Sequence, residues 1–170
     1  MAITAERLCQ QSNLEPTDLD ESIIDPDDNA SDQQLAMLEW IDANVLSIAD
    51  GEVSVPLLET TGYDTVDDFI DQRFPKVSIV VRTGWKTKGN ALYDGAVLSY
   101  GRSEINKCVN STADEYDKDS DQDRIQGNQR LQKLIEWAMT LIKTQGDGSA
   151  NQSRNYAGLT SVGVDTKVVW

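Results

Sequence analysis

Residues 130–144, RLQKLIEWAMTLIKT, decide the fold that the sequence predicts. Their apolar side chains recur at intervals of three and four residues, which is the spacing of one face of an α-helix. The stripe is wide enough to pack on more than one neighbour, and we expect the helix to run roughly from Asp121 to Thr144. It comprises Leu131, Leu134, Ile135, Ala138, Leu141 and Ile142. The sequence therefore predicts a mainly α fold, a small helical bundle.

A second core helix is expected immediately upstream, over residues 90–110. One side of it carries Val97, Leu98, Gly101, Ile105 and Cys108. Gly95 and Gly101 lower the intrinsic stability of this helix, but they permit close approach of another backbone. We expect the polar segment NSTADEYDKDSD, residues 110–121, to connect the two core helices as a loop.

Another helical pattern covers residues 33–49. Its apolar positions are Leu35, Leu38, Ile41, Val45 and Ile48. Ser31 or Asp32 can cap its start, and Gly51 is expected to stop it. Residues 52–58 are expected to be a short extended piece.

Two shorter helices complete the prediction, one at residues 4–12 and one after Thr65. The spacing from Thr65 to Asp68 resembles a capping box, and Pro75 ends the helix that follows. We assign the packing of the whole bundle to Leu35, Leu38, Ile41, Val97, Ile105, Leu131, Leu134, Ile135 and Leu141.

Residues 76–85 have a different period. The side chains alternate, with Val77, Ile79 and Val81 on one side and Ser78, Val80 and Arg82 on the other. A period of two is typical of an extended chain. The sequence therefore predicts a minor strand or an extended arm here, followed by a turn at residues 87–90.

The C-terminal residues differ from the rest in composition. Residues 146–158 are rich in Gly, Ser, Asn and Gln, as flexible linkers are, and the apolar arm at residues 159–170 ends in VDTKVVW. Such an arm can fold back as an edge strand or reach another chain by strand addition, and the sequence leaves both open. We expect a helical domain, residues 1–145, and a flexible linker with a C-terminal arm, residues 146–170.

Charge is unevenly distributed along the chain, whose net charge is −14. Residues 1–74 hold 18 acidic and 2 basic residues, whereas residues 75–170 hold 11 acidic and 13 basic ones. An acidic surface repels nucleic acid, and the asymmetry suits head-to-tail contact between copies or docking on a basic partner. The same charges can equally form solvated faces that keep the protein in solution.

The sequence predicts no catalytic, metal or cofactor site. It contains no histidine, which removes the commonest general base and the commonest zinc ligand. Alternate carboxylates at residues 117–123 resemble the start of a calcium loop. However, Gln122 stands where that loop needs glycine, and Asn128 stands where it needs a bidentate Glu. We therefore expect a binding protein and not an enzyme.

Cysteine use and hydropathy suggest the compartment. Cys9 and Cys108 have no metal-like spacing and are expected to be reduced thiols, with a bridge between them left open. The start of the sequence has no signal-peptide pattern, and no long apolar run follows. The sequence predicts a soluble intracellular protein that does not engage a membrane.

Two segments are the candidate partner-binding surfaces. KVSIVVRTGWKTK, residues 76–88, combines basic residues with Trp85, but its charge is a weak footprint for nucleic acid, and we expect no direct sequence-specific nucleic-acid binding. In the arm, Trp170 is expected to anchor a contact between molecules. The candidate residues are Arg82, Trp85, Lys86 and Lys88, together with Leu159, Val162, Val164, Val168, Val169 and Trp170.

One local pattern carries a family resemblance. VDDFIDQRFPKV, residues 66–77, resembles the helix ending in an I-D-x-x-L-x-x-R-Y-P run in head-to-tail connector, or adaptor, proteins of tailed bacteriophages. ALYDGAVLSYGRSEI looks like the next core helix of that family, and RLQKLIEWAMTLIKTQGDG looks like its long last helix. The resemblance covers roughly residues 65–148, whereas residues 1–60 and 76–88 depart from the family's pattern.

The resemblance implies a ring of small helical subunits beneath the portal, without cofactor or active site, whose arms contact neighbours and portal. The sequence thus predicts a structural virion protein of the phage neck, made in the host cytoplasm. Its expected partners are other copies of itself, the portal, and tail or stopper proteins. The alternative is an acidic regulatory protein that mimics nucleic acid and inhibits a host nucleic-acid-binding protein.

Overall fold

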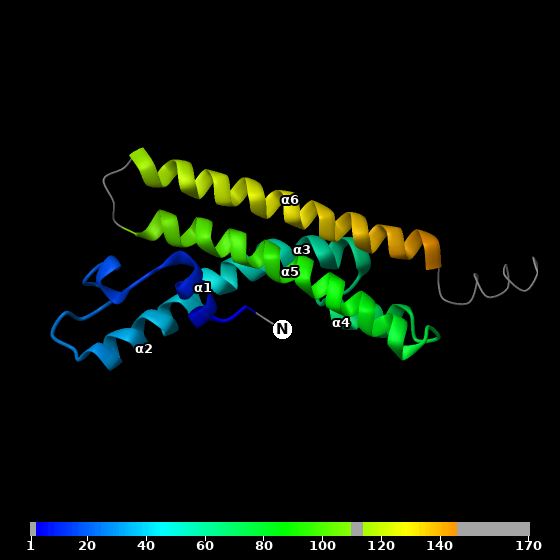
Figure 1. Ribbon diagram of the computed structural model, residues 1–170, viewed down its shortest axis with the longest axis horizontal. Helices are drawn as coiled ribbons and strands as arrows, with labels where there is room; N and C mark the ends of the chain where they lie inside the picture. Colours follow the sequence, from blue (N-terminus) through cyan, green and yellow to red (C-terminus); the bar gives the residue numbers. More distant parts are fainter. Residues whose placement is uncertain (1–2, 110–113, 146–170) are drawn as a thin grey trace, which may run out of the picture.

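The computed structural model describes residues 3–109 and 114–145 (Figure 1). Within these two ranges it contains helices and turns and no strand, so the predicted mainly α fold is confirmed. The α-helices are α1 (Ala5–Ser12), α2 (Ala30–Ile41), α3 (Ser47–Thr61), α4 (Val66–Arg73), α5 (Ile79–Cys108) and α6 (Asp114–Gln145). Two short segments are the 3-10 turn η1 (Pro16–Asp18) and the π-helical segment η2 (Asp42–Leu46).

Helices α5 and α6 form a long antiparallel hairpin, and the other helices pack along one side of it (Figure 1). The Nη1 atom of Arg130 in α6 donates a hydrogen bond of 2.7 Å to the carbonyl oxygen of Gly95 in α5. At Gly127 an added Cβ would lie 3.0 Å from the ring of Tyr100. The two helices therefore approach closely where one of them has no side chain.

Glycines on α5 also receive side chains from other elements. A Cβ at Gly101 would lie 2.8 Å from the side chain of Leu8 of α1, so a side chain packs closely on Gly101, where the sequence predicted the close approach of another backbone. A Cβ at Gly89 would overlap the ring of Trp137. Close packing of this kind leaves no room for an extra methyl group without a shift of the neighbour.

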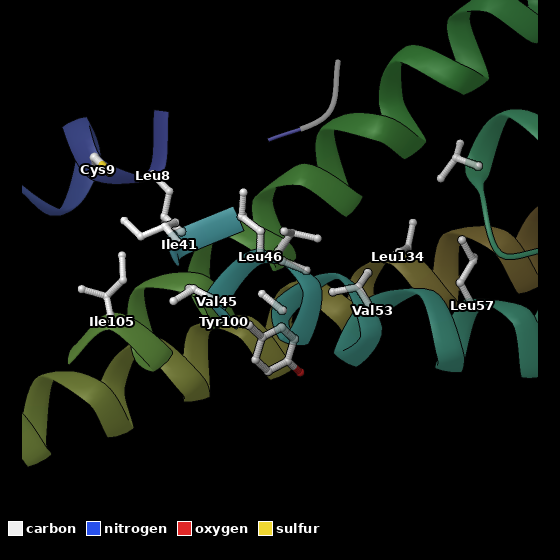
Figure 2. Close-up of a cluster of buried hydrophobic side chains, with 14 of the residues drawn as sticks. Leu8, Cys9, Ile41, Val45, Leu46, Val53, Leu57, Tyr100, Ile105 and Leu134 are labelled. Atoms are coloured by element: carbon white, nitrogen blue, oxygen red, sulfur yellow. The ribbon is translucent and has the colours of Figure 1, made fainter. Parts of the chain in front are cut away.

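The core lies where α1, η2, α3, α5 and α6 meet (Figure 2). Fully buried side chains from these elements point toward one another in Figure 2, among them Leu8, Val45, Val53, Tyr100 and Leu134. Burial of one such side chain stabilises the fold by roughly 1.5–3 kcal/mol.

Most of the predicted packing residues are in the core, and one is not. Ile41, Val97, Ile105, Leu134 and Leu141 are buried, while Leu38, Leu131 and Ile135 are partly buried. The assignment of Leu35 to the core is wrong, because its side chain is 56% exposed. Met37, Ile41 and Val45 define the inner face of this helix, and Leu35, two residues before Met37, points to the opposite side.

The helix predicted at residues 33–49 is longer than expected. It begins at Ala30 with Asn29 as N-cap, passes through η2 and continues as α3 to Thr61. The predictions of a stop at Gly51 and an extended piece at residues 52–58 are therefore wrong. Ala49, Val53 and Leu57 recur every four residues and are completely buried, so their packing overrides the Gly and Pro signals of this segment.

The two short predicted helices are confirmed. The helix α1 occupies nearly all of the expected residues 4–12, with Thr4 as its N-cap. The backbone N–H of Asp68 donates to Thr65 Oγ1 at 3.1 Å, and the Thr65 hydroxyl donates to the Asp68 carboxylate at 2.7 Å. The helix α4 then ends at Arg73, just before Phe74 and Pro75.

The predicted strand at residues 76–85 and the turn at residues 87–90 are both wrong. The helix α5 begins at Ile79, after Ser78 as N-cap, and runs through both segments. The apolar alternation covers only a few residues, whereas Trp85, Gly89 and Ala96 continue the helical face that packs on α4 and α6. Long-range packing therefore outweighs the local period of two.

The last helix is also longer than predicted. The helix α6 starts at Asp114, so most of the expected loop at residues 110–121 is helical. Within the described residues both cysteines are free, with Cys9 buried and Cys108 exposed. No helix in residues 3–109 or 114–145 combines the length and apolar character that crossing a membrane requires. The predicted linker and arm, residues 146–170, lie outside the described residues.

Candidate functional site

The basic segment predicted to bind partners lies in the first three turns of α5, next to α4. Arg82 Nη1 lies 2.9 Å from one carboxylate oxygen of Asp71 in α4, and Lys86 Nζ lies 2.6 Å from the other. The hydrogen bond from Lys86 and the positive charges of Lys86 and Arg82 lower the pKa of Asp71. Of the four candidate residues in this segment, Arg82 and Lys86 are thus already paired within the molecule. Lys88 is exposed.

Trp85 is partly buried and takes part in an aromatic cluster that holds α4 against α5. Its ring meets the edge of Phe74, with ring centroids 5.4 Å apart. Phe74 in turn lies 5.5 Å from Phe69, and Phe69 lies 6.2 Å from Trp137 of α6. Edge-to-face aromatic contacts of this kind add to the energy of burial. The position of Trp85 is therefore explained by folding.

The apolar first turn of α5 is not explained by folding. The side chains of Ile79, Val80 and Val81 are 73%, 82% and 43% exposed. Three consecutive positions on a helix point in directions about 100° apart, so together they coat the end of the helix. We call this surface the α5 apolar turn. The sequence predicts a partner-binding surface at residues 76–88, but it points to the basic residues and Trp85 and not to these three, which it places on a strand.

A second exposed apolar surface lies on α3. Ile48, Val55 and Leu58 are exposed on one face of this helix. Beside them a shallow groove of about 380 Å³ is lined by Ile48, Gly51, Glu52, Val55 and Pro56. Isolated exposed apolar residues are normal, but residues gathered on one helix face are typical of contact surfaces.

An acidic segment, residues 15–32, lies at the opposite end of the molecule from the α5 apolar turn (Figure 1). Residues 15–32 contain eight acidic residues and no basic one. Several of these carboxylates accept hydrogen bonds from nearby N–H groups: Asp18 from Glu15, Asp20 from Ser22, and Asp25 from Asp27. Such Asx-type contacts fix turns, so part of the acidic character serves the local fold.

One pocket combines acidic groups with a tyrosine. It measures about 450 Å³ and is lined by Asp50, Ser54, Asp64, Thr65, Val66, Asp67, Asn90, Tyr93 and Asp94. The Tyr93 hydroxyl donates a hydrogen bond of 2.7 Å to Asp50. Burial and the negative charge of Asp50 raise the pKa of Tyr93, so this hydroxyl stays protonated near neutral pH. Among the described residues no group of His, Cys, Asp and Glu side chains has the arrangement of a metal site.

The remaining candidate residues belong to the arm. Leu159, Val162, Val164, Val168, Val169 and Trp170 lie outside the described residues. Comparison of the chain with protein-family models, with curated proteins and with solved structures finds no match.

Proposed function

We propose that the protein is a structural subunit of the neck of a tailed-phage virion, an oligomeric ring that links portal to tail. The main observation behind the proposal is the α5 apolar turn, because a segment of a neighbouring chain can cover these exposed apolar side chains in the assembled ring. The segments that resemble the connector family coincide with α4, α5 and α6, which pack on one another. In this reading the protein acts by assembly, and it requires no catalytic group or cofactor.

Assembly would use the two ends of the molecule. The acidic residues 15–32 of one copy face the basic groups near the start of α5 in the next copy or in the portal. Lys76 and Lys88 are the exposed cations there, since Arg82 and Lys86 are paired with Asp71. A head-to-tail contact uses two different surfaces of each subunit, and it closes into a ring when its rotation allows.

The test is a native pull-down of the tagged full-length protein from its own biological source. The co-purifying chains are identified by mass spectrometry, and the copies are counted from the particle mass. We expect recovery with portal, tail or stopper chains in a multi-copy ring. Recovery of a single host nucleic-acid-binding protein, at about one copy each, would overturn the proposal.

Two variants sharpen this experiment. Removal of residues 159–170 is expected to abolish recovery of the ring and leave the domain folded. Val80→Asp is expected to weaken assembly, whereas Leu35→Asp, a matched change at another exposed apolar residue, is expected to leave it unchanged. Assembly that survives removal of residues 159–170 contradicts the role proposed for the arm.

The second candidate function is an acidic inhibitor that mimics nucleic acid. It is favoured by residues 15–32, which contain eight acidic residues and no basic one. The triple change Glu21→Gln, Asp27→Asn and Asp28→Asn spares the carboxylates of Asp18, Asp20 and Asp25 that accept the turn hydrogen bonds. If the protein mimics nucleic acid, the triple change should weaken partner binding more than removal of residues 159–170 does. If it is a connector, removal of residues 159–170 should weaken binding more.

A further inference from the structure

The α5 apolar turn has no cover among the residues that the structure describes. Val80 is 82% exposed, more than any other large apolar side chain in the described residues. Ile79 and Val81 flank it along the chain, so three adjacent apolar side chains are exposed in the first turn of the helix. An apolar surface of this kind gains free energy when another apolar segment removes it from water.

The register of the α5–α6 hairpin shows which part of the chain is near. Trp137 of α6 lies against Gly89 of α5, and Arg130 lies against Gly95. Both helices rise by the same distance per residue, so eight residues beyond Trp137 correspond to eight residues before Gly89. Gln145, the last described residue, therefore lies opposite Val81. In Figure 1 the end of α6 and the start of α5 lie at the same end of the molecule.

We propose that residues 162–170 dock on the α5 apolar turn of the same molecule. These nine residues contain four valines and a tryptophan, and Asp165 is their one acidic residue. The intervening residues 146–161 can span roughly 20–24 Å as a flexible chain, and they follow Gln145, which lies at the same end of the molecule as the α5 apolar turn. The length of chain and its point of departure thus allow the contact without strain.

Electrostatics also favours this occupant. The side chain of Ser78, the N-cap of α5, makes no capping hydrogen bond. The first backbone N–H groups of an α-helix have no acceptor within the helix. The N-terminal end of a helix attracts negative charge. Asp165 lies between the valines of the arm, where it can approach this end while the apolar side chains cover Ile79, Val80 and Val81.

Docking within one molecule is favoured over docking between molecules in the isolated protein. A short flexible tether gives an effective concentration in the millimolar range, well above the micromolar concentration of a typical sample. The same contact can be exchanged between neighbours in a ring, as in domain swapping. The proposal concerns the isolated chain and does not depend on the proposed function.

The experiment uses methyl NMR of the full-length protein with labelled Ile and Val methyl groups. We expect nuclear Overhauser effects between the Trp170 indole and the methyl groups of Ile79, Val80 or Val81. A sample that mixes labelled and unlabelled chains separates contacts within a molecule from contacts between molecules. Absence of these effects, or their presence only between molecules, overturns the proposal.

A matched pair of variants gives a second readout. Val80→Asp is expected to release the arm and to accelerate tryptic cleavage after Lys167 about tenfold, because proteolysis follows the population of the open form. Leu35→Asp places the same charge on an exposed apolar site of α2, and cleavage is expected to keep the wild-type rate. Equal rates of cleavage after Lys167 in the wild type, Val80→Asp and Leu35→Asp contradict docking of the arm. Ring assembly in the pull-down is measured separately, so either idea can fail without the other.

Discussion

The two ends of α5 differ in what their side chains contact. From Gly89 to Ile105 the helix is packed by α1, α3 and α6, and its buried positions are mostly small residues that fit those neighbours. In its first turn, Ile79, Val80 and Val81 are exposed, although they are among the most apolar residues in the chain. One continuous helix is therefore closely packed in one part and exposes apolar side chains at its start.

The acidic residues support the same distinction. In residues 15–32 many carboxylates form turns with their own backbone, so a high local charge has an explanation within the fold. The α5 apolar turn has no such explanation among the described residues. An exposed apolar surface is therefore stronger support for a contact than a charged one.

The largest expected effect is a difference in sign between two glycines of α5. An added Cβ at Gly89 would overlap Trp137, whereas nothing lies within 4 Å of one at Gly84. Gly89→Ala should lower the free energy of unfolding by about 1–3 kcal/mol through overpacking. Gly84→Ala should raise it by about 0.5–1 kcal/mol, since alanine is the better helix former. Urea unfolding measures both.

If both substitutions shift the free energy of unfolding in the same direction, α5 is not closely packed at Gly89 and open at Gly84 as described. Destabilisation by Gly84→Ala means that the start of α5 is closely packed in solution. Tolerance of Gly89→Ala means that the hairpin is looser than the structure describes.

A smaller effect is expected where the packed part of α5 meets a buried carboxylate. Asp123 of α6 is 4% exposed, lies 3.5 Å from Arg102 and accepts a hydrogen bond of 3.3 Å from Asn106. Asp123→Ala should lower the free energy of unfolding by about 1–3 kcal/mol, because it removes a buried charged acceptor. Asp121→Ala, at an exposed position of the same helix, should change it by less than about 0.5 kcal/mol. Equal losses from the two variants in urea unfolding would show that Asp123 is not buried as described.

The smallest effect belongs to Asp71 of α4, which pairs with Arg82 and Lys86 near the start of α5. Its lowered pKa means that the ionised form is favoured in the folded state. The stabilisation is therefore complete above the unfolded-state pKa and is lost as pH falls below about 4, through the folded-state pKa. Because the ion pairs are exposed, the effect is small. The difference in unfolding free energy between wild type and Asp71→Asn should shrink on acidification, and a constant difference contradicts the assignment.

Much of the fold follows from periodic patterns in the sequence. The stripe in residues 130–144 predicts a long helix because its spacing repeats over several turns. The short helix after Thr65 is predicted from a cap and a terminating proline. The error at residues 76–85 has a physical reason. The six residues 77–82 alternate as in a strand, whereas the packing of α5 on α4 and α6 favours a helix. Likewise, Gly51 and Pro56 suggest a break that the buried face of α3 overrides.

The candidate partner-binding surface is harder to predict from the sequence than the fold. Arg82, Trp85, Lys86 and Lys88 were selected for charge and aromaticity, but the pairing of two of them with Asp71 depends on how α4 packs. Exposure of the α5 apolar turn also depends on tertiary structure, since the same residues would be buried with a different neighbour. The prediction that the arm binds a partner stays a prediction, because its residues lie outside the described ranges.

A double-mutant cycle that combines Val80→Asp with removal of residues 159–170 tests directly whether the arm covers the α5 apolar turn. If the arm covers the α5 apolar turn, Val80→Asp should cost about 1 kcal/mol of unfolding free energy in the full chain and almost nothing in the truncated chain. Leu35→Asp should change the free energy of unfolding by the same amount in the full chain and in the truncated chain. Equal costs of Val80→Asp in the two backgrounds would contradict the claim that this end of α5 receives the arm.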